Sequence, residues 1–330
     1  RPAGAFQINA NAGVMLLAMG IARMGQLIRF IPVTVVIGFT NGIAVVIFLA
    51  QLKDFFGLKI DTLPAEFFLR LKTLAAHAHT VDLPTLGLST ACLAVLLSYN
   101  RLAQRIALLR RAPGPLVVLV GGTVLATLLD LPVETIGSRF NGIPQEVPPI
   151  GLPPLSINDF GKLISPALTI ALLGAIESLL SARVADSQID DRHDPNQELI
   201  AQGLANLAAP LFGGFAATGA IARTTTNVRT GGRTPIAGII HALILLSIVL
   251  VAAPLAAYVP LAALSAIVMV VAVNMGEWHE FRELRRYSYN YRIILLATFF
   301  VTVVFDLTIA VELGMVLASL FFIYRMSELT

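Results

Sequence analysis

The chain has 330 residues, of which 56% are hydrophobic and 13% are charged, and its mean hydropathy is +0.80. Soluble globular domains have about 25% charged residues, so this composition excludes an ordinary soluble domain and indicates a polytopic membrane protein. The formal net charge of +3 does not indicate a nucleic-acid partner, because the basic residues fall in short loops, where they orient membrane proteins.

Apolar segments long enough for membrane helices recur along the chain. In chain order they are 12–26, 30–50, 84–99, 113–129, 163–182, two spans within the charge-free stretch 234–276, 292–305 and 307–324. Two less apolar helices, 198–212 and 218–230, suit positions that neighbouring helices screen from lipid. The fold class predicted is therefore all-α, with about ten membrane helices.

The loops on one side of the predicted membrane are rich in arginine. They carry Arg23, Arg29, Arg101, Arg105, Arg110, Arg111, Arg292 and Arg325. The loops on the other side, 53–82 and 130–159, are longer and mixed in sign. The positive-inside rule makes the arginine-rich side cytoplasmic, and we expect a multi-pass protein of the bacterial cytoplasmic (inner) membrane.

The segment 213–235, GGFAATGAIARTTTNVRTGGRTP, is too short and too polar for an ordinary span. A helix that begins part-way through a membrane directs unpaired backbone N–H groups and the positive end of its dipole at the midplane. Irregular backbone at that depth lines a cavity. The sequence therefore predicts an anion site at the small residues Gly219, Ala220, Ile221 and Ala222. The alternative is that these small residues serve helix packing.

Arg223 follows one turn into the same predicted helix, where an unpaired charge is costly. We expect it to stabilise the anion, whereas Arg229 and Arg233 are expected to be ordinary positive-inside arginines. A second small segment, Ala3, Gly4 and Ala5, is a candidate for an equivalent broken helix in the first half of the chain.

Glu177 is the other intramembrane charge of interest. Helical spacing aligns Ala167, Ala171, Gly174, Ser178 and Ser181 as a stripe of small residues, and Glu177 borders that stripe. The carboxylate is therefore expected to face packed protein, where its protonation would respond to an anion nearby. The alternative is a structural, hydrogen-bonding carboxylate.

Catalytic and metal-binding motifs are absent from the sequence. There is no HExxH, no phosphate-cradling GxxxxGK and no nucleophile elbow, and the histidines lack metal-ligand spacing. We expect a protein that is not an enzyme and has no cofactor or metal, apart from a coupling H⁺ or Na⁺.

Three passages resemble one known family, the sulfate permease (SulP), or solute carrier twenty-six, anion transporters. They are RFIPVTVVIGFTNGIAVVIFLAQLKDFFG at 29–57, the stretch 174–235 with GAIESLLSARVADSQ and HDPNQELIAQGLANLAAPLFGG, and FDLTIAVELGMVLASLFFIYR at the end. The resemblance implies a seven-plus-seven inverted repeat with core and gate domains and two half-helices meeting at the midplane. On this map the core domain comprises residues 1–28 and 161–256, and the gate domain residues 29–160 and 257–330.

The resemblance also implies roles for particular residues. A coupling proton or sodium would be bound by Glu177, with Ser181 as a second ligand, and substrate by Ala3–Ala5 and Gly219–Arg223. Relatives carry about one more helix, ~20 residues, between the positions of Phe6 and Ala12, which we interpret as residues missing here. They also carry two earlier helices and a following STAS domain that aids a homodimer.

The expected function is secondary active transport of an anion by alternating access in the lipid bilayer, with proton-coupled symport favoured. The anion is left open among sulfate, bicarbonate, chloride and dicarboxylates such as fumarate. The alternatives are an anion channel or exchanger of the same fold, and a nucleobase transporter.

Overall fold

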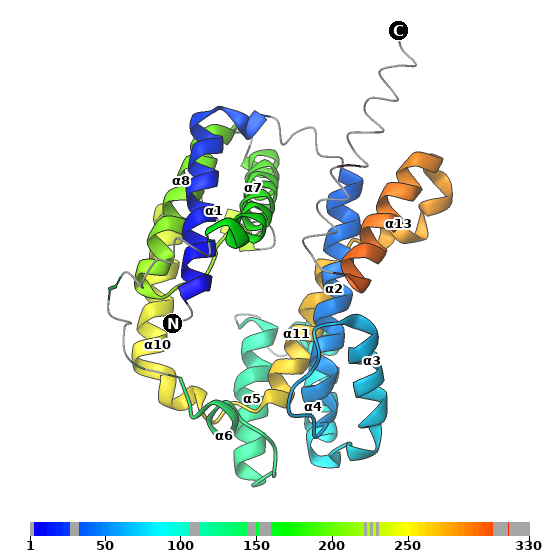
Figure 1. Ribbon diagram of the computed structural model, residues 1–330. Helices are drawn as coiled ribbons and strands as arrows, with labels where there is room; N and C mark the ends of the chain where they lie inside the picture. The colour runs from blue at the N-terminus through cyan, green and yellow to red at the C-terminus, as the bar shows by residue number, and fades with distance from the viewer. Residues whose placement is uncertain are drawn as a thin grey trace. The chain divides into compact units, whose positions relative to one another are not determined.

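The computed structural model describes residues 3–26, 33–105, 112–143, 145, 150–151, 160–189, 191–220, 223–224, 227–228, 231–305 and 316. Their regular structure is helical (Figure 1). The longer helices are α1 (Ala3–Ile21), α2 (Val33–Phe56), α3 (Phe67–Ala76), α4 (Leu83–Arg105), α5 (Gly114–Leu128), α7 (Phe160–Ile189), α8 (Pro195–Ala208), α10 (Ile236–Ala256), α11 (Leu261–Met275) and α13 (Tyr289–Val304). The short ones are η2 (Ala78–Thr80), α6 (Ile136–Phe140), η5 (Ala209–Phe212), α12 (Trp278–Arg282) and η6 (Leu284–Arg286).

Four of the described helices are long and apolar enough to cross a membrane: Gly4–Ile21, Thr34–Phe56, Gly161–Arg183 and Ile236–Ala256. Four shorter apolar helices accompany them: Leu83–Tyr99, Gly114–Leu128, Leu261–Met275 and Tyr289–Val304. Only 6% of the Ile236–Ala256 window is buried although its hydropathy is 2.7. A helix that is apolar on all sides and little buried among the described residues is typical of a membrane span, in agreement with the prediction of a multi-pass membrane protein.

Most predicted spans correspond to observed helices, with two corrections. The stretch 53–82, predicted as a loop, contains α3, which is amphipathic and buries Leu74. The predicted span 307–324 lies outside the described residues apart from Val316.

The second correction concerns α1. A short first segment ending near Phe6 was expected, but the structure has one 19-residue helix from Ala3 to Ile21. That relatives carry further residues between Phe6 and Ala12 stays a prediction. No proline interrupts this stretch, and the polar residues Gln7 and Asn9 are buried, 6% and 2% exposed. Because packing inside the protein covers these residues, the helix continues through a sequence too polar to face lipid.

The chain forms two compact units, Arg1–Val33 with Glu146–Ile244, and Thr34–Gln145 with Leu245–Thr330. The expected core and gate domains remain a prediction. In the first unit, α1 lies along α8 (Figure 1). A Cβ added at Gly13 would lie 2.9 Å from the Leu207 nitrogen, and one at Gly203 would lie 2.6 Å from the Leu17 nitrogen. The two backbones therefore touch, an approach that only glycine permits.

In the second unit, α2 packs against α13 through a Gly-x-x-x-Gly pair. A Cβ at Gly38 would lie 2.6 Å from the Leu295 carbonyl, and one at Gly42 would lie 2.5 Å from the Thr302 Cβ. A separate core joins α4, α5 and α11 through Cys92, Val118 and Ala263. Small residues at these contacts let membrane helices approach closely.

Candidate functional site

The chain between η5 and the predicted half-helix is held by α8. Asn206, 1% exposed, accepts a hydrogen bond from the Ala217 N–H at Oδ1 (2.9 Å) and donates from Nδ2 to the Ala217 carbonyl (2.8 Å). Gln202, one turn earlier on α8, also donates to that carbonyl. An extended peptide group, which has no helical partners of its own, is thus paired by side chains.

The next two residues are held by α7. The Thr218 hydroxyl donates to the Gly174 carbonyl at 3.1 Å and lies 3.0 Å from the Ser178 hydroxyl. The Gly219 N–H donates to Ser178 Oγ at 3.1 Å. A Cβ at Gly219 would lie 3.1 Å from the Ser178 Cα, so the absence of a side chain lets this backbone lie directly on α7.

A helix begins immediately after this contact. The Thr224 N–H donates to the Ala220 carbonyl at 2.9 Å, and the described residues Arg223, Thr224, Asn227 and Val228 are helical. Ser181 of α7 donates to the Thr224 hydroxyl at 2.7 Å. The helix start is therefore fixed to α7 one turn beyond Ser178.

The described residues from Asn227 to Gly232 include a helix end. Gly231 adopts the left-handed conformation, φ 101°, its N–H donates to the Val228 carbonyl, and the Gly232 N–H donates to the Asn227 carbonyl. These two bonds form a Schellman motif, which pairs the last carbonyls of a helix. The segment predicted as a short helix therefore has a start and a stop of its own.

The small-residue site differs in one respect from the sequence prediction. The Gly219 N–H, expected to face an anion, is already paired with Ser178. The N–H of Ala220 donates to no group in the described part of the chain, so Ala220 is the first residue whose donor is left for a ligand. Ile221 and Ala222 lie outside the described residues, as does Arg229.

The charged candidates flank this helix start. Arg223 is exposed and lies within electrostatic reach of the Glu177 carboxylate. The stripe of small residues beside Glu177 is buried as expected, with Ala167 and Ala171 at 0% and Ser178 at 1% exposure. Glu177 itself is exposed, so the expectation that packed protein surrounds its carboxylate is wrong. The small residues beside Glu177, and not Glu177 itself, contact the neighbouring backbone.

This arrangement agrees with the comparisons with known proteins. The Sulfate permease family matches residues 3–298. The chain belongs to the sulfate permease family. It is 42% identical over 97% of its length to "Putative sulfate transporter YvdB" of Bacillus subtilis, of which it covers 59%. It is 32% identical over 98% of its length to "Bicarbonate transporter BicA" of Synechocystis, of which it covers 56%.

A solved structure also supports membership of the sulfate permease family. The transmembrane domain of a cyanobacterial bicarbonate transporter, BicA, superposes with a TM-score of 0.82 at 31% identity, over 94% of this chain and 76% of that one. The all-α transporter fold predicted from sequence is thereby confirmed. The named relatives are transporters, in agreement with the prediction that the protein is not an enzyme.

The other small segment, Ala3–Ala5, begins α1. A Cβ at Gly4 would meet nothing within 4 Å, whereas one at Gly174 of α7 would meet Leu16, at 3.8 Å. Leu16 lies eleven residues beyond Ala5, about 16 Å along a helix axis. The described contacts do not bring Ala3, Gly4 and Ala5 to Gly219, and their role in binding remains a prediction.

Several residues that build the candidate site were not predicted. Asn206, Gln202, Thr218 and Thr224 hold the segment in place. The sequence does contain a signal for two of them. Gln202 and Asn206 lie four residues apart on a partly apolar helix, and buried amides need hydrogen-bond partners. Nothing in the sequence indicated that those partners would be the backbone of Ala217. Ser181 donates to Thr224, and its role as a second cation ligand stays a prediction.

Proposed function

We propose that the protein is a secondary active anion transporter of the cytoplasmic membrane that works by alternating access. The observation that carries this proposal is the start of the helix at Ala220. The backbone leading to it is hydrogen-bonded to α7 and α8, whereas the Ala220 N–H donates to no group among the described residues. Such a helix start attracts anions through its N–H groups and its dipole. The exposed guanidinium of Arg223 adds a full positive charge nearby.

The printed names of the relatives support an inorganic oxyanion as the substrate. One is called a putative sulfate transporter and another a bicarbonate transporter. Both anions present several acceptor oxygens to backbone donors, as do dicarboxylates such as fumarate. We rank an oxyanion above chloride on this ground.

Coupling to protons is a further part of the proposal. Glu177 carries a carboxylate within reach of Arg223, so a bound anion and an ionised Glu177 would compete for the same guanidinium. Protonation of Glu177 removes that competition, and anion and proton would then enter together. We favour H⁺ over Na⁺ because this competition is relieved by protonation of the carboxylate itself.

The chain spans less than two thirds of the length of the curated relatives, 59% and 56%. The transport cycle therefore belongs to the whole protein, and we propose for it a homodimer aided by a STAS domain. Within this chain, the core domain would carry the anion past the gate domain.

Counterflow in proteoliposomes tests the transport proposal. Vesicles loaded with unlabelled sulfate, bicarbonate, chloride, fumarate or uracil would be assayed for uptake of the matching radiolabelled solute. Saturable counterflow of one or more anions is expected. Flux that does not saturate would indicate the channel alternative, and counterflow of uracil alone would indicate the nucleobase alternative.

A further inference from the structure

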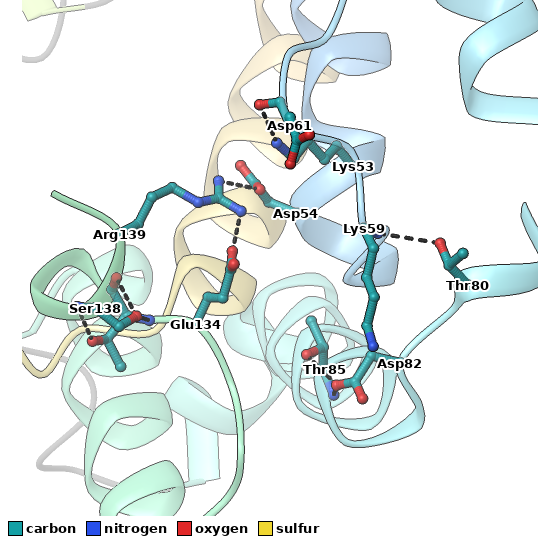
Figure 2. Close-up of polar contacts among 11 residues, drawn as sticks. Lys53, Asp54, Lys59, Asp61, Thr80, Asp82, Thr85, Glu134, Ser138 and Arg139 are labelled. Atoms are coloured by element: carbon teal, nitrogen blue, oxygen red, sulfur yellow. Dashed lines mark hydrogen bonds and ion pairs between the residues drawn. The ribbon is translucent and has the colours of Figure 1, made fainter. Parts of the chain in front are cut away.

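The segment between α2 and α4 folds back along α2 instead of extending beyond it. It leaves α2 after Phe56 and returns to the same place, where the Asp82 N–H donates to the Phe56 carbonyl at 3.1 Å. The two limbs of the segment also meet at the Lys59 N–H, which donates to the Thr80 hydroxyl at 3.1 Å (Figure 2). Residues 57–82 therefore form a closed excursion, and this excursion contains α3.

Two contacts place α3 beside the body of α2. Arg70, in the first half of α3, donates from Nη1 to the Val46 carbonyl at 3.4 Å. Leu74, one turn later, belongs to a buried cluster against which Leu52 and Phe56 of α2 pack. Val46 precedes Phe56 by ten residues, about 15 Å along a helix axis, and α3 is about as long. Helix α3 therefore runs back along the last three turns of α2.

The level of Val46 lies within an apolar membrane helix. The first charged residues of α2 towards this end are Lys53 and Asp54, and they are paired with polar groups. Lys53 donates to the Asp61 carbonyl at 3.4 Å, and Asp54 lies 2.6 Å from Arg139 (Figure 2). Val46 is seven residues before Lys53, about 10 Å along the axis. Each headgroup layer is about 5–7 Å thick, so the start of α3 lies where the headgroups give way to hydrocarbon.

Arg70 is hydrogen-bonded in a way that suits this depth. Its Nε donates to the Pro64 carbonyl at 2.9 Å and its Nη2 to the Ala65 carbonyl at 2.9 Å, in addition to the bond from Nη1 to Val46. All three nitrogens thus have backbone acceptors, and no carboxylate pairs with Arg70 among the described residues. Charged side chains at membrane depth pair with one another or with backbone carbonyls. The guanidinium is therefore provided for without a shell of water.

The outward face of α3 is apolar and uncovered. Phe68, Leu69 and Leu71 are 61%, 47% and 38% exposed, and all three lie at the start of the helix. Lys72 is the one exposed charge within α3, and its long stem lets the ammonium reach the headgroups. The apolar surface continues on α13, which contacts α3 and exposes Phe300 to 57%.

Glu66 precedes this face and limits how deep it can lie. It is the N-cap residue of α3, its side chain makes no capping hydrogen bond, and it is exposed. A carboxylate in hydrocarbon is costly, so Glu66 has to stay among the headgroups. The neighbouring Phe68 then reaches the acyl chains while the helix itself lies at the boundary.

The combination of depth and composition selects the occupant of this face. Water would meet three large apolar side chains, which is unfavourable, and a soluble partner does not reach the boundary with hydrocarbon. An amphipathic helix at the interface buries its apolar face about 5–10 Å into the boundary between headgroups and acyl chains. We propose that α3 is an interfacial membrane helix, whose Phe68, Leu69 and Leu71 contact lipid acyl chains of the adjoining leaflet.

Fluorescence quenching in proteoliposomes tests the proposal independently of transport. The chain has one tryptophan, which Trp278→Phe removes, and in that background Phe68→Trp and Leu69→Trp each report on the outward face. His79→Trp is the control for water, because it is exposed next to Thr80, at the level where α2 has ended. Ile240→Trp, 50% exposed on the apolar helix α10, is the control for lipid. Each variant would be measured in phosphatidylcholine brominated on its acyl chains, and in unbrominated lipid with iodide in the buffer.

Brominated lipid is expected to reduce the emission of Phe68→Trp and Leu69→Trp as much as that of Ile240→Trp, and that of His79→Trp far less. Iodide is expected to quench in the reverse order. Because the two α3 variants are read separately, one still decides the matter where the other fails to fold. Quenching of both by iodide and not by bromine would make α3 an aqueous loop. Protection of both from either quencher would show that a protein surface, such as a second copy of the chain, covers the face; both results overturn the proposal.

Discussion

The Asn206 side chain makes two hydrogen bonds to the backbone of Ala217: it accepts from the N–H at 2.9 Å and donates to the carbonyl at 2.8 Å. The two bonds resemble the reciprocal pair between neighbouring strands of a sheet, except that one of the two amide groups belongs to a side chain. Because Ala217 is held in this way, Gly219, two residues later, lies against Ser178, and the next helix begins there. The position of the predicted anion site therefore depends on a residue that would not itself touch the anion.

Replacing Asn206 with leucine removes both bonds to Ala217. At about 0.5–1.5 kcal/mol net for each hydrogen bond, we expect a loss of about 1–3 kcal/mol in stability, measured as a lower midpoint of thermal unfolding in detergent. The counterflow rate should also fall, by more than the loss of folded protein accounts for, because the start of the helix is no longer held in place. Gln197→Leu, an exposed change on the same helix, is the control, and equal behaviour of the two variants would contradict the bracing role.

Ala220→Leu tests the anion site directly. The Ala220 N–H is the first of the helix that has no acceptor within the described ranges, and a leucine side chain there would obstruct approach to the backbone. We expect counterflow to be abolished while the unfolding midpoint stays near that of the parent. Ala201→Leu, at an exposed position of α8, is the matched control. Normal uptake by Ala220→Leu would show that the anion binds elsewhere, and the same test applies to Ala222.

Arg223→Ala tests the role of the fixed charge. Since hydrogen bonds to charged groups contribute about 1.5–3 kcal/mol, the KM for the anion should rise at least about tenfold, with a smaller change in maximal rate. Arg233→Ala, an exposed arginine beyond the Schellman motif, should change KM little, and so should Arg229→Ala. Similar small effects of all three would make Arg223 a topology residue.

Gly42→Ala tests the packing of α2 on α13. The new Cβ would lie 2.5 Å from that of Thr302, so one helix must move, at a cost of about 1–3 kcal/mol. Gly87 on α4 is the control, because a Cβ there would meet nothing within 4 Å and alanine in a helix is favoured by about 0.5–1 kcal/mol. We expect the unfolding midpoint to fall for Gly42→Ala and to hold or rise for Gly87→Ala.

The helices were predictable because hydropathy and length alone determine most of them. The spans at 113–129 and 163–182 correspond to α5 and α7, since lipid allows few alternatives to an apolar helix. Helix α1 was not predicted correctly, because the polar residues between Phe6 and Ala12 suggested an interruption. Burial of Gln7 and Asn9 by the rest of the fold depends on long-range packing, which local hydropathy does not contain.

The candidate site shows the same limit. The small residues at 219–222 could be singled out from sequence because their composition is unusual inside a membrane protein. The pairing of Gly219 with Ser178 could not, because residues 41 positions apart were matched by the fold. The same holds for Arg139 and Asp54, whose ion pair joins residues 85 positions apart.

Glu177 is predicted to couple proton entry to anion entry. Its carboxylate lies within electrostatic reach of Arg223, so the ionised form competes with an incoming anion and the protonated form does not. Uptake should therefore accelerate as external pH falls, and an inward proton gradient should drive accumulation without sodium.

Glu177→Gln fixes the side chain in a neutral form of nearly the same shape. We expect this variant to exchange anion across the membrane in counterflow but to lose accumulation driven by a proton gradient, because no proton is carried with the anion. Its counterflow rate should also lack the acceleration at low pH that we expect of the parent. The measurement is uptake against pH in proteoliposomes, with imposed proton or sodium gradients. Accumulation with the parental pH profile would make Glu177 a structural carboxylate, and accumulation in the parent that requires sodium would assign the coupling ion as Na⁺.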